Sequence, residues 1–335
     1  NPAEYSVAVV ANSSLVPLLN DGLVRSLDDL VAKHGGSLQK HQLVTIDGKI
    51  MAIAFMANAQ HFYYRSDILE KAGVAVPTTY EDVLTAAKAI KSAGLMEHPF
   101  AFNSAPGWNL GEEFINMYMG TGADFFKPGT AEVSINNEHG IATLNMMKAL
   151  TEHSNPDFLT FNSDATAALW EAGDLALATM WGSRAGPILD SEGSTEAITS
   201  TTVVASAPSF AGGSRPSSTL WWDGFAIASN VSDMDAEASF IAMMNGISSE
   251  MVKANNDLTV WLIDGYKAGP TAVGVSETAA NGAAPYPMLP FMGTLHGAAG
   301  AELTDFLQGN ESAEQALSDI EAAYTAAAIE KGFLN

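Results

Sequence analysis

The chain has 335 residues, of which 38 are acidic and 15 are basic, so its formal net charge is −23 at pH 7. This length exceeds what a single hydrophobic core usually fills, so we expect two lobes. The acidic balance argues against nucleic acid as a partner, because phosphates require clustered Lys and Arg, and the lack of cysteine excludes disulfides, thiolate metal sites and cysteine nucleophiles.

Strands and helices alternate along the chain, which predicts an α/β fold with helices layered on sheets. Apolar and β-branched runs predict strands at 5–11, 50–54, 60–65, 100–103, 175–181, 203–207 and 225–228. Amphipathic spacing and capping residues predict helices at 15–19, 27–34, 67–72, 80–93, 109–119, 137–153, 164–171, 235–246, 249–255, 301–308 and 312–331. Asp47-Gly48 predicts a hairpin turn and Thr79 a helix N-cap.

The sequence offers no motif for a metal, a cofactor or a covalent nucleophile. The histidines lack the spacing of metal ligands, and 211–213 is glycine-rich but lacks the Gly-Lys-Ser/Thr of a phosphate-binding loop. No G-x-S-x-G is present. We therefore expect no metal, no cofactor and no catalysis.

Three segments together are similar to one protein family. The first carries Asp-Gly-Lys-Ile, then Tyr-Tyr-Arg-Ser-Asp-Ile-Leu, Ala-Gly and Pro-Thr-Thr-Tyr-Glu-Asp, at 47–50, 63–69, 72–73 and 77–82. The second is Leu-Trp-Glu-Ala-Gly-Asp-Leu-Ala at 169–176, and the third joins Phe-Ala-Ile-Ala at 225–228 to 236–244. In order and spacing they resemble family 1 extracellular solute-binding proteins of ABC importers, the maltose-binding-protein group.

The resemblance implies a two-lobed periplasmic-binding-protein fold of the class II type, in which hinge strands join two lobes that hold the ligand. It places 1–101 and about 222–265 in an N-terminal lobe, and 102–221 and about 266–335 in a C-terminal lobe. Family members begin with a strand, a helix and a second strand before the segment that matches 5–11, so we expect this part to be missing from the sequence. The resemblance also implies a monomer that closes on a sugar or polyol and delivers it to the membrane permease of an ABC importer. The expected location is the periplasm, or the extracellular side of a Gram-positive membrane to which the protein is tethered.

Sugar recognition needs aromatic platforms for C–H faces and planar polar groups for hydroxyls. The candidate ligand-binding residues that meet this need are Trp108, Asn109, Trp181, Arg184, Trp221, Trp222, Asp223 and His296. Adjacent indoles on a strand point to opposite faces, so one of Trp221 and Trp222 is expected in the core and the other can stack on ligand. Alternatively, both indoles pack in the hinge and Asp223 caps a turn. Arg184 can bind hydroxyls or an anionic substituent, or form a structural salt bridge.

Four further polar candidates are Asn12, Ser13, Asn58 and Gln60. Asn12 and Ser13 follow the first strand at its carboxyl end, where open α/β sheets bind ligands, although helix capping explains them equally well. Asn58 and Gln60 lie in an expected loop at 55–61 that matches a family segment with a polar contact. His296 matches a position where maltose-binding relatives carry an aromatic residue, or else is a solvated loop histidine.

Other functions stay open at this stage. A carbohydrate-active hydrolase can use Glu112 and Asp223 as a carboxylate pair, although an exposed helix acid is the simpler interpretation of Glu112. A receptor for an acidic or sulfonated sugar would make use of Arg184, and a receptor for another small solute is a further alternative. A scaffold that binds only protein would lack an aromatic surface.

Overall fold

The computed structural model describes residues 4–335, which form two compact units. Unit 1 comprises 4–58, 220–272 and 285–290, and unit 2 comprises 59–219, 273–284 and 291–335. The expected division is corrected for 285–290, which belongs to unit 1 rather than to the C-terminal lobe, and for 59–101, which belongs to unit 2 rather than to the N-terminal lobe. The reason is strand pairing: Gln60–Tyr64 pairs with Leu177–Trp181, and Phe100–Ala101 pairs with Leu177–Ala178, all inside unit 2. The first three residues of the predicted N-terminal lobe lie outside the described residues.

The sheet of unit 1 is largely antiparallel. Its strands are β1 (Val7–Ala11), β2 (Leu43–Ile46), β8 (Val260–Trp261) and the parts of β3 (Lys49–Arg65) and β7 (Thr219–Ile227) that lie in this unit. β1 pairs with β7, while β2 and β8 pair with β3. The predicted hairpin turn joins β2 to β3, with positive φ at Asp47 (50°) and Gly48 (75°).

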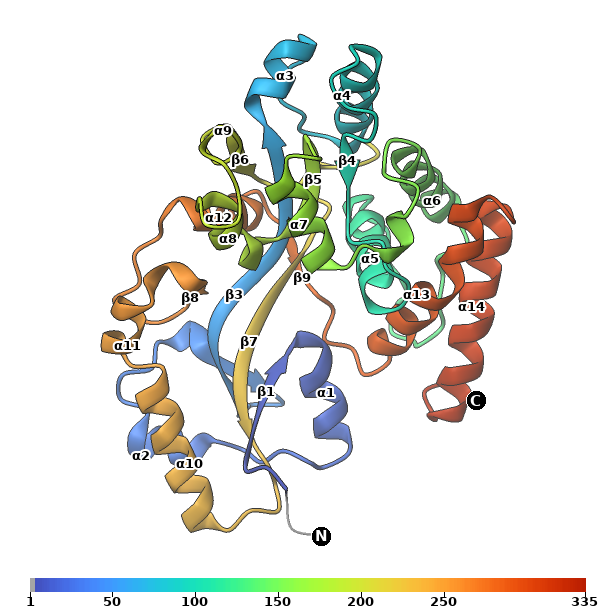
Figure 1. Ribbon diagram of the computed structural model, residues 1–335. Helices are drawn as coiled ribbons and strands as arrows, with labels where there is room; N and C mark the ends of the chain where they lie inside the picture. Colours follow the sequence, from blue (N-terminus) through green and yellow to red (C-terminus); the bar gives the residue numbers. More distant parts are fainter. Residues whose placement is uncertain (1–3) are drawn as a thin grey trace. The chain divides into compact units, whose positions relative to one another are not determined.

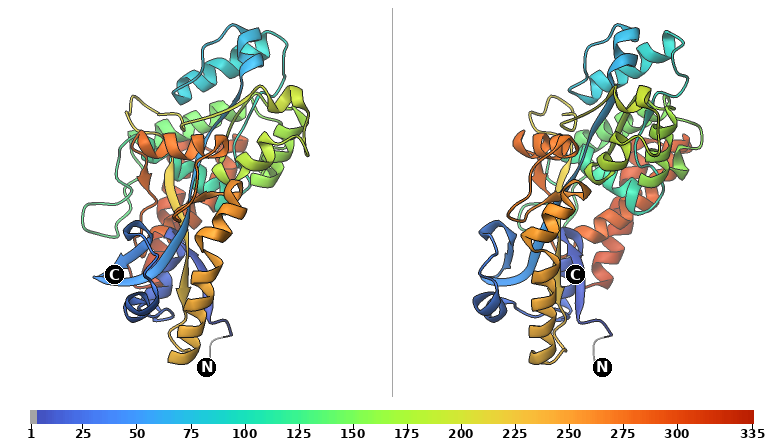
Figure 2. Two further views of the ribbon diagram at one scale, coloured as in Figure 1. Left: turned by 90° about the vertical axis from the view of Figure 1, so that its left-hand side faces the viewer. Right: turned by 60° about the vertical axis from the view of Figure 1, so that its left-hand side comes forward.

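Helices cover both faces of this sheet (Figures 1 and 2). Its helices are α1 (Asn12–Asn20), α2 (Asp28–His34), α10 (Asp233–Gly246) and α11 (Ser249–Ala254). Phe240 of α10 packs with Leu27, Ile53 and Ile227 on one face. On the other face, residues of α1 pack with apolar strand residues in a second core around Leu15. Gly224 of β7 allows close strand approach, because a Cβ there would lie 2.7 Å from the carbonyl oxygen of Ile53.

Unit 2 is built on the C-terminal part of β3, which pairs antiparallel with β5 (Leu177–Trp181) and β6 (Thr202–Ala205). β4 (Phe100–Ala101) runs parallel to β5. The core on this sheet centres on Trp170 and Tyr63, both fully buried. Because β4 and β5 are parallel, their carboxyl ends meet at one edge of the sheet, and the chain leaves that edge toward Trp108 and Trp181.

Helices surround the sheet of unit 2. They are α3 (Ser66–Ala72), α4 (Tyr80–Ser92), α5 (Trp108–Gly120), α6 (Glu138–Thr151), α7 (Ser163–Ala172), α8 (Ala185–Leu189), α9 (Glu196–Thr199), α12 (Val273–Ala280), α13 (Met292–Gln308) and α14 (Ala313–Glu330). Thr79 caps α4 as predicted, because its side chain accepts from the Asp82 N–H. Helices α5, α13 and α14 lie side by side (Figure 1).

Three predicted element boundaries were wrong. The expected loop at 55–61 is the middle of β3, whose 17 residues contain neither Gly nor Pro and find strand partners on both sides of that point. β7 begins at Thr219, so the Trp221–Asp223 segment is strand. α13 begins at Met292, nine residues before the predicted start, because three glycines within it concealed the helical pattern.

No helix among residues 4–335 combines the length and the apolar character needed to cross a bilayer.

Candidate functional site

Unit 2 gathers three of the predicted residues into one aromatic cluster. The rings of Trp108 and His296 stack with centroids 4.9 Å apart and planes at 29°. The rings of Trp108 and Trp181 stack at 5.9 Å and 28°. Trp108 therefore joins the other two rings, and 46% of its surface is exposed. We call Trp108, Trp181 and His296 the aromatic surface of unit 2.

Backbone geometry holds Trp108 in this place. Gly107, which precedes α5, has φ 90°, a conformation that residues with a Cβ rarely adopt. Its N–H donates to the Gly300 carbonyl of α13 at 2.9 Å. One turn into α5, a Cβ on Gly111 would lie 2.5 Å from the His296 carbonyl oxygen. Glycines therefore let α5 and α13 approach closely enough for Trp108 to meet His296.

Trp181 reaches the cluster from the sheet. It is the last residue of β5, and its carbonyl accepts a 2.9 Å hydrogen bond from the hydroxyl of Tyr63 in β3. Tyr63 is fully buried, so the end of β5 is fixed by the core of the unit.

His296 is a helix residue of α13 and only 2% exposed, so its interpretation as a solvated loop histidine was wrong. Its Nε2 lies 2.7 Å from the Trp108 carbonyl, and because a carbonyl only accepts, Nε2 carries the hydrogen. Burial lowers the pKa of His296 to about 4, against the opposing effect of this hydrogen bond. The imidazole is therefore neutral near pH 7, with its Nδ1 lone pair 3.9 Å from Glu112 Oε2.

Arg184 follows Trp181 by three residues and forms a local ion pair. One terminal nitrogen lies 2.6 Å from Asp164 and 2.9 Å from the Ser163 hydroxyl, both in the first turn of α7. This geometry favours the structural alternative for Arg184 over ligand binding.

Asn12 and Ser13 in unit 1 have different surroundings. The Asn12 side chain is 2% exposed and brackets β7: its Oδ1 accepts from the Trp222 N–H at 2.9 Å and its Nδ2 donates to the Leu220 carbonyl at 3.3 Å. Ser13 is half-buried. The hydroxyl that binds the backbone at the start of α1 is that of Ser14, which accepts from the Ala11 N–H. Asn12 thus holds the strand that carries the Trp-Trp pair.

The two adjacent indoles of β7 have different surroundings. Trp221 is 7% exposed and packs on Tyr286 with centroids 4.3 Å apart, while Trp222 is half-buried beside the core around Leu15. Asp223 is half-buried, and burial raises its pKa. Trp222 and Asp223 are therefore the members of this group that reach the surface of unit 1.

The remaining candidates lie on regular elements. Asn109 is the second residue of α5 and half-buried. Asn58 and Gln60 lie on β3, where Asn58 is the last residue of unit 1 and Gln60 belongs to unit 2 and is 3% exposed. The Gln60 carbonyl accepts from the Ser218 hydroxyl at 2.7 Å.

A buried polar network beneath the aromatic surface was missed from the sequence. Glu112 is 0% exposed, so its interpretation as an exposed helix acid was wrong, and Glu113 is 4% exposed. The Glu113 Oε1 accepts from the backbone N–H and the amide of Asn103 at 3.0 and 3.1 Å. Burial raises the pKa of Glu113 to about 8 despite these contacts. One signal was available: Glu113 follows Leu110 by three residues and precedes Met117 by four, which is the spacing of the apolar face of α5.

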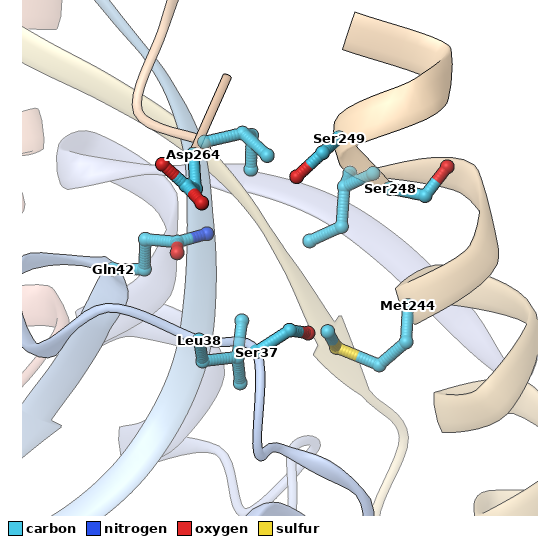
Figure 3. Close-up of a pocket in the computed structure, with 9 residues that line it drawn as sticks. Ser37, Leu38, Gln42, Met244, Ser248, Ser249 and Asp264 are labelled. Carbon is cyan, nitrogen blue, oxygen red and sulfur yellow. The ribbon is translucent and has the colours of Figure 1, made fainter. Parts of the chain in front are cut away.

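Two pockets lie away from these residues. The pocket of unit 1 has a lining of polar and apolar side chains (Figure 3), formed by Ser37, Leu38, Gln42, Met244, Ile247, Ser248, Ser249, Ile263 and Asp264. The pocket of unit 2 is formed by 95–98, Asn155, Leu169 and 173–175. Neither contains a predicted residue. Among residues 4–335, no group of three His, Asp or Glu side chains is arranged to hold a metal.

Both units are of the α/β type and share the long strand β3, and unit 2 carries the aromatic surface at the carboxyl end of β5. The model of the family "Bacterial extracellular solute-binding protein" matches residues 3–250, and the chain belongs to this family. The family membership expected from the sequence is therefore confirmed.

Solved structures of the same fold are similar over most of the chain. A ribitol-bound ABC transporter solute-binding protein of Agrobacterium radiobacter K84 has a TM-score of 0.84 and 19% identity, covering 97% of this chain and 85% of that one. The maltose-bound MalE3 of T. maritima has a TM-score of 0.81 and 20% identity, with coverages of 97% and 85%. A laminaribiose-bound sugar transporter of Arthrobacter chlorophenolicus A6 has a TM-score of 0.77 and 18% identity, with coverages of 96% and 84%. The predicted fold is thereby confirmed.

A curated relative gives a shorter match. The "Probable ABC transporter-binding protein" of Deinococcus radiodurans is 23% identical over 143 residues, which are 41% of this chain and 34% of the relative. The match thus spans about a third of the length of that protein.

Proposed function

We propose that this protein is the sugar or polyol receptor of an ABC importer, and that it binds its ligand without chemical conversion. The observation that carries the proposal is the half-exposed indole of Trp108, stacked with Trp181 and His296 in unit 2. A pyranose or polyol presents C–H groups that pack on such rings. Bound ribitol, maltose and laminaribiose in the three structural neighbours support this ligand class.

In this proposal Trp222 and Asp223 of unit 1 contribute a second indole and a carboxylate that accepts hydroxyl hydrogen bonds. Ligand-driven hinge closure follows if the ligand contacts the closed form better than the open form. The permease of the importer then receives the closed, loaded protein. The proposed place of action is the periplasm or, with a tether, the outer side of a Gram-positive membrane.

A thermal-shift screen tests this proposal. Ribitol, mannitol, maltose, laminaribiose and glucuronate are added to the purified protein, because a ligand that binds the native state raises the melting temperature. At least one neutral sugar or polyol is expected to do so, and isothermal titration calorimetry then gives the dissociation constant. Chromatography of the recovered ligand should show it unchanged.

The matched variants are Trp108→Ala and Tyr5→Ala. Tyr5 is an aromatic residue of unit 1 that is 73% exposed, and it has no place in the proposal. Trp108→Ala is expected to weaken binding at least about tenfold, equivalent to about 1.4 kcal/mol, with Tyr5→Ala unchanged. Full affinity in Trp108→Ala, or cleavage of the ligand, would overturn the proposal.

A further inference from the structure

A single hydroxyl in unit 2 lies between two oxygen acceptors. Oγ1 of Thr219 is 2.6 Å from Glu112 Oε1 and 2.8 Å from Asn116 Oδ1. All three residues are buried, at 0%, 0% and 1% exposed. Both distances are those of hydrogen bonds, so each oxygen pair needs a proton between its atoms.

The orientation of the Asn116 amide is fixed by the backbone. The Thr219 N–H lies 2.8 Å from Asn116 Oδ1 and requires an acceptor, so the oxygen of the amide faces Thr219. Asn116 Oδ1 therefore has no proton to give to the Thr219 hydroxyl. The hydroxyl itself carries one hydrogen, which can satisfy only one of the contacts to Glu112 Oε1 and Asn116 Oδ1.

The missing proton is accounted for if it resides on Glu112. Protonated Oε1 donates to Thr219 Oγ1, and Thr219 Oγ1 donates onward to Asn116 Oδ1, so both contacts become hydrogen bonds. With an ionised Glu112, the Thr219 hydroxyl would have to divide its one hydrogen between two acceptors in a buried setting, which costs free energy.

Glu112 lies between two residues from different parts of unit 2. On one side is His296, whose Nδ1 lies 3.9 Å from Glu112 Oε2 and whose Nε2 binds the carbonyl of Trp108. On the other side is Thr219, the last residue of unit 2 before the chain enters unit 1 at Leu220. Glu113 and His296 are titratable neighbours of Glu112, and the pKa values of both are shifted toward the neutral forms.

We infer that Glu112 carries a proton and acts as a positioning residue. It fixes the position of the aromatic surface of unit 2 relative to Thr219, the residue at which the chain leaves the unit. Its role in ligand affinity rests on the proposed function, whereas its protonation does not. Glu112 touches neither ligand nor solvent in this inference. It acts through His296 and Thr219.

Infrared difference spectroscopy of the ligand-free protein tests whether the side chain of Glu112 is protonated. The spectra compare Glu113→Gln with the double variant Glu112→Gln/Glu113→Gln near pH 7, so that the second buried carboxyl does not contribute. We expect the added substitution to remove the carbonyl band of a protonated carboxylic acid. Loss of a carboxylate band instead would overturn the inference. Nitrogen NMR of His296 should show the neutral imidazole with its hydrogen on Nε2, and an imidazolium would also overturn it.

Two substitutions test the positioning role. Gln imitates the protonated acid and donates to Thr219, so Glu112→Gln is expected to bind the ligand within about threefold of wild type, a difference of about 0.6 kcal/mol. Glu112→Leu removes the donor and is expected to lose at least about tenfold in affinity. The matched control is Glu138→Gln on α6, whose side chain is 92% exposed. Equal affinity of the Gln and Leu variants would overturn the positioning role, and if no panel ligand binds, the ligand-free spectra still decide the protonation.

Discussion

His296 and Trp108 meet twice, through their rings with centroids 4.9 Å apart and through a 2.7 Å hydrogen bond from His296 Nε2 to the backbone carbonyl of Trp108. The first contact positions the side chain of Trp108 and the second its backbone. A residue buried in α13 thus determines how the first residue of α5 presents its ring.

We expect the stacked indoles of Trp108 and Trp181 to be energetically coupled. A double-mutant cycle with alanine at both positions should give a coupling free energy of about 0.5–1.5 kcal/mol, because stacked rings contribute that much beyond buried area. Urea denaturation of the four proteins measures it. Trp108→Ala combined with Ile329→Ala, an apolar residue of comparable exposure (49%) on α14, is expected to be additive. A coupling indistinguishable from zero for the indole pair would mean that the rings are adjacent without mutual stabilisation.

Gly111→Ala is expected to destabilise the protein, although alanine is the better helix former by about 1 kcal/mol. A Cβ at Gly111 would lie 2.5 Å from the His296 carbonyl oxygen, so α5 would have to move away from α13. Gly297→Ala in α13 is the matched control, because a Cβ there has no described neighbour within 4 Å. Thermal denaturation should show a lower melting temperature for Gly111→Ala and an equal or higher one for Gly297→Ala. Equal behaviour of the two variants would contradict close approach at Gly111.

The buried carboxyl of Glu113 should make the free energy of unfolding depend on pH. Burial raises its pKa from 4.5 to about 8 in the folded protein, so between these values the folded state holds a proton that the unfolded state has lost. Stability from this group is therefore complete below about pH 4.5 and decreases as pH rises toward 8. His61 and His296 act in the opposite sense, since burial lowers their pKa values from 6.5 to about 4, and their contribution is complete above about pH 6.5.

Urea denaturation at pH values from about 6.5 to 8 isolates the Glu113 effect. Wild type should lose stability across this window, and Glu113→Gln should lose less. If both proteins respond identically, the carboxyl of Glu113 does not titrate there.

Asn12→Ala is expected to destabilise unit 1 by about 1–3 kcal/mol. The substitution removes the acceptor of the Trp222 N–H and the donor to the Leu220 carbonyl in β7. Ser13→Ala, at the next position of α1, should change the free energy of unfolding by less than about 0.5 kcal/mol. Chemical denaturation compares them, and a small effect of Asn12→Ala would show that water replaces the amide without cost.

Arg184→Gln is expected to leave the affinity for a neutral sugar within about threefold of wild type. Its guanidinium is held by Asp164 and Ser163, so the ion pair accounts for its position without a ligand. Calorimetry with the ligand from the screen measures this. A large loss specific to glucuronate would instead restore Arg184 as a ligand for acidic sugars.

Much of the fold follows from local sequence signals. Asp47-Gly48 and Thr79 act where the turn and capping patterns placed them, and most helices begin within a few residues of their predicted start. β3 was divided in error because strand signals are short-range, whereas its continuity depends on partners more than 100 residues away. His296 was assigned to a loop because the glycines around it, which permit helix contacts, also weaken the helical pattern.

The candidate site likewise contains residues that local sequence signals predict and residues that depend on distant partners. Trp108 and Trp181 could be proposed because aromatic residues at element ends are visible in the sequence. The roles of Asn12 and Glu112 could not, since each depends on a partner distant in the sequence, at Trp222 and Thr219. The sequence alone does not distinguish an Asn or Glu side chain that faces solvent from one that hydrogen-bonds to a strand.

The interleaved segments of unit 1 have a consequence for biogenesis. Its last segment, 285–290, follows 59–219 and 273–284 of unit 2 along the chain, so unit 1 cannot complete its structure before these parts of unit 2 have been synthesised. No single proteolytic cut or gene truncation yields either unit intact. Folding of unit 1 is thereby tied to the synthesis of most of unit 2.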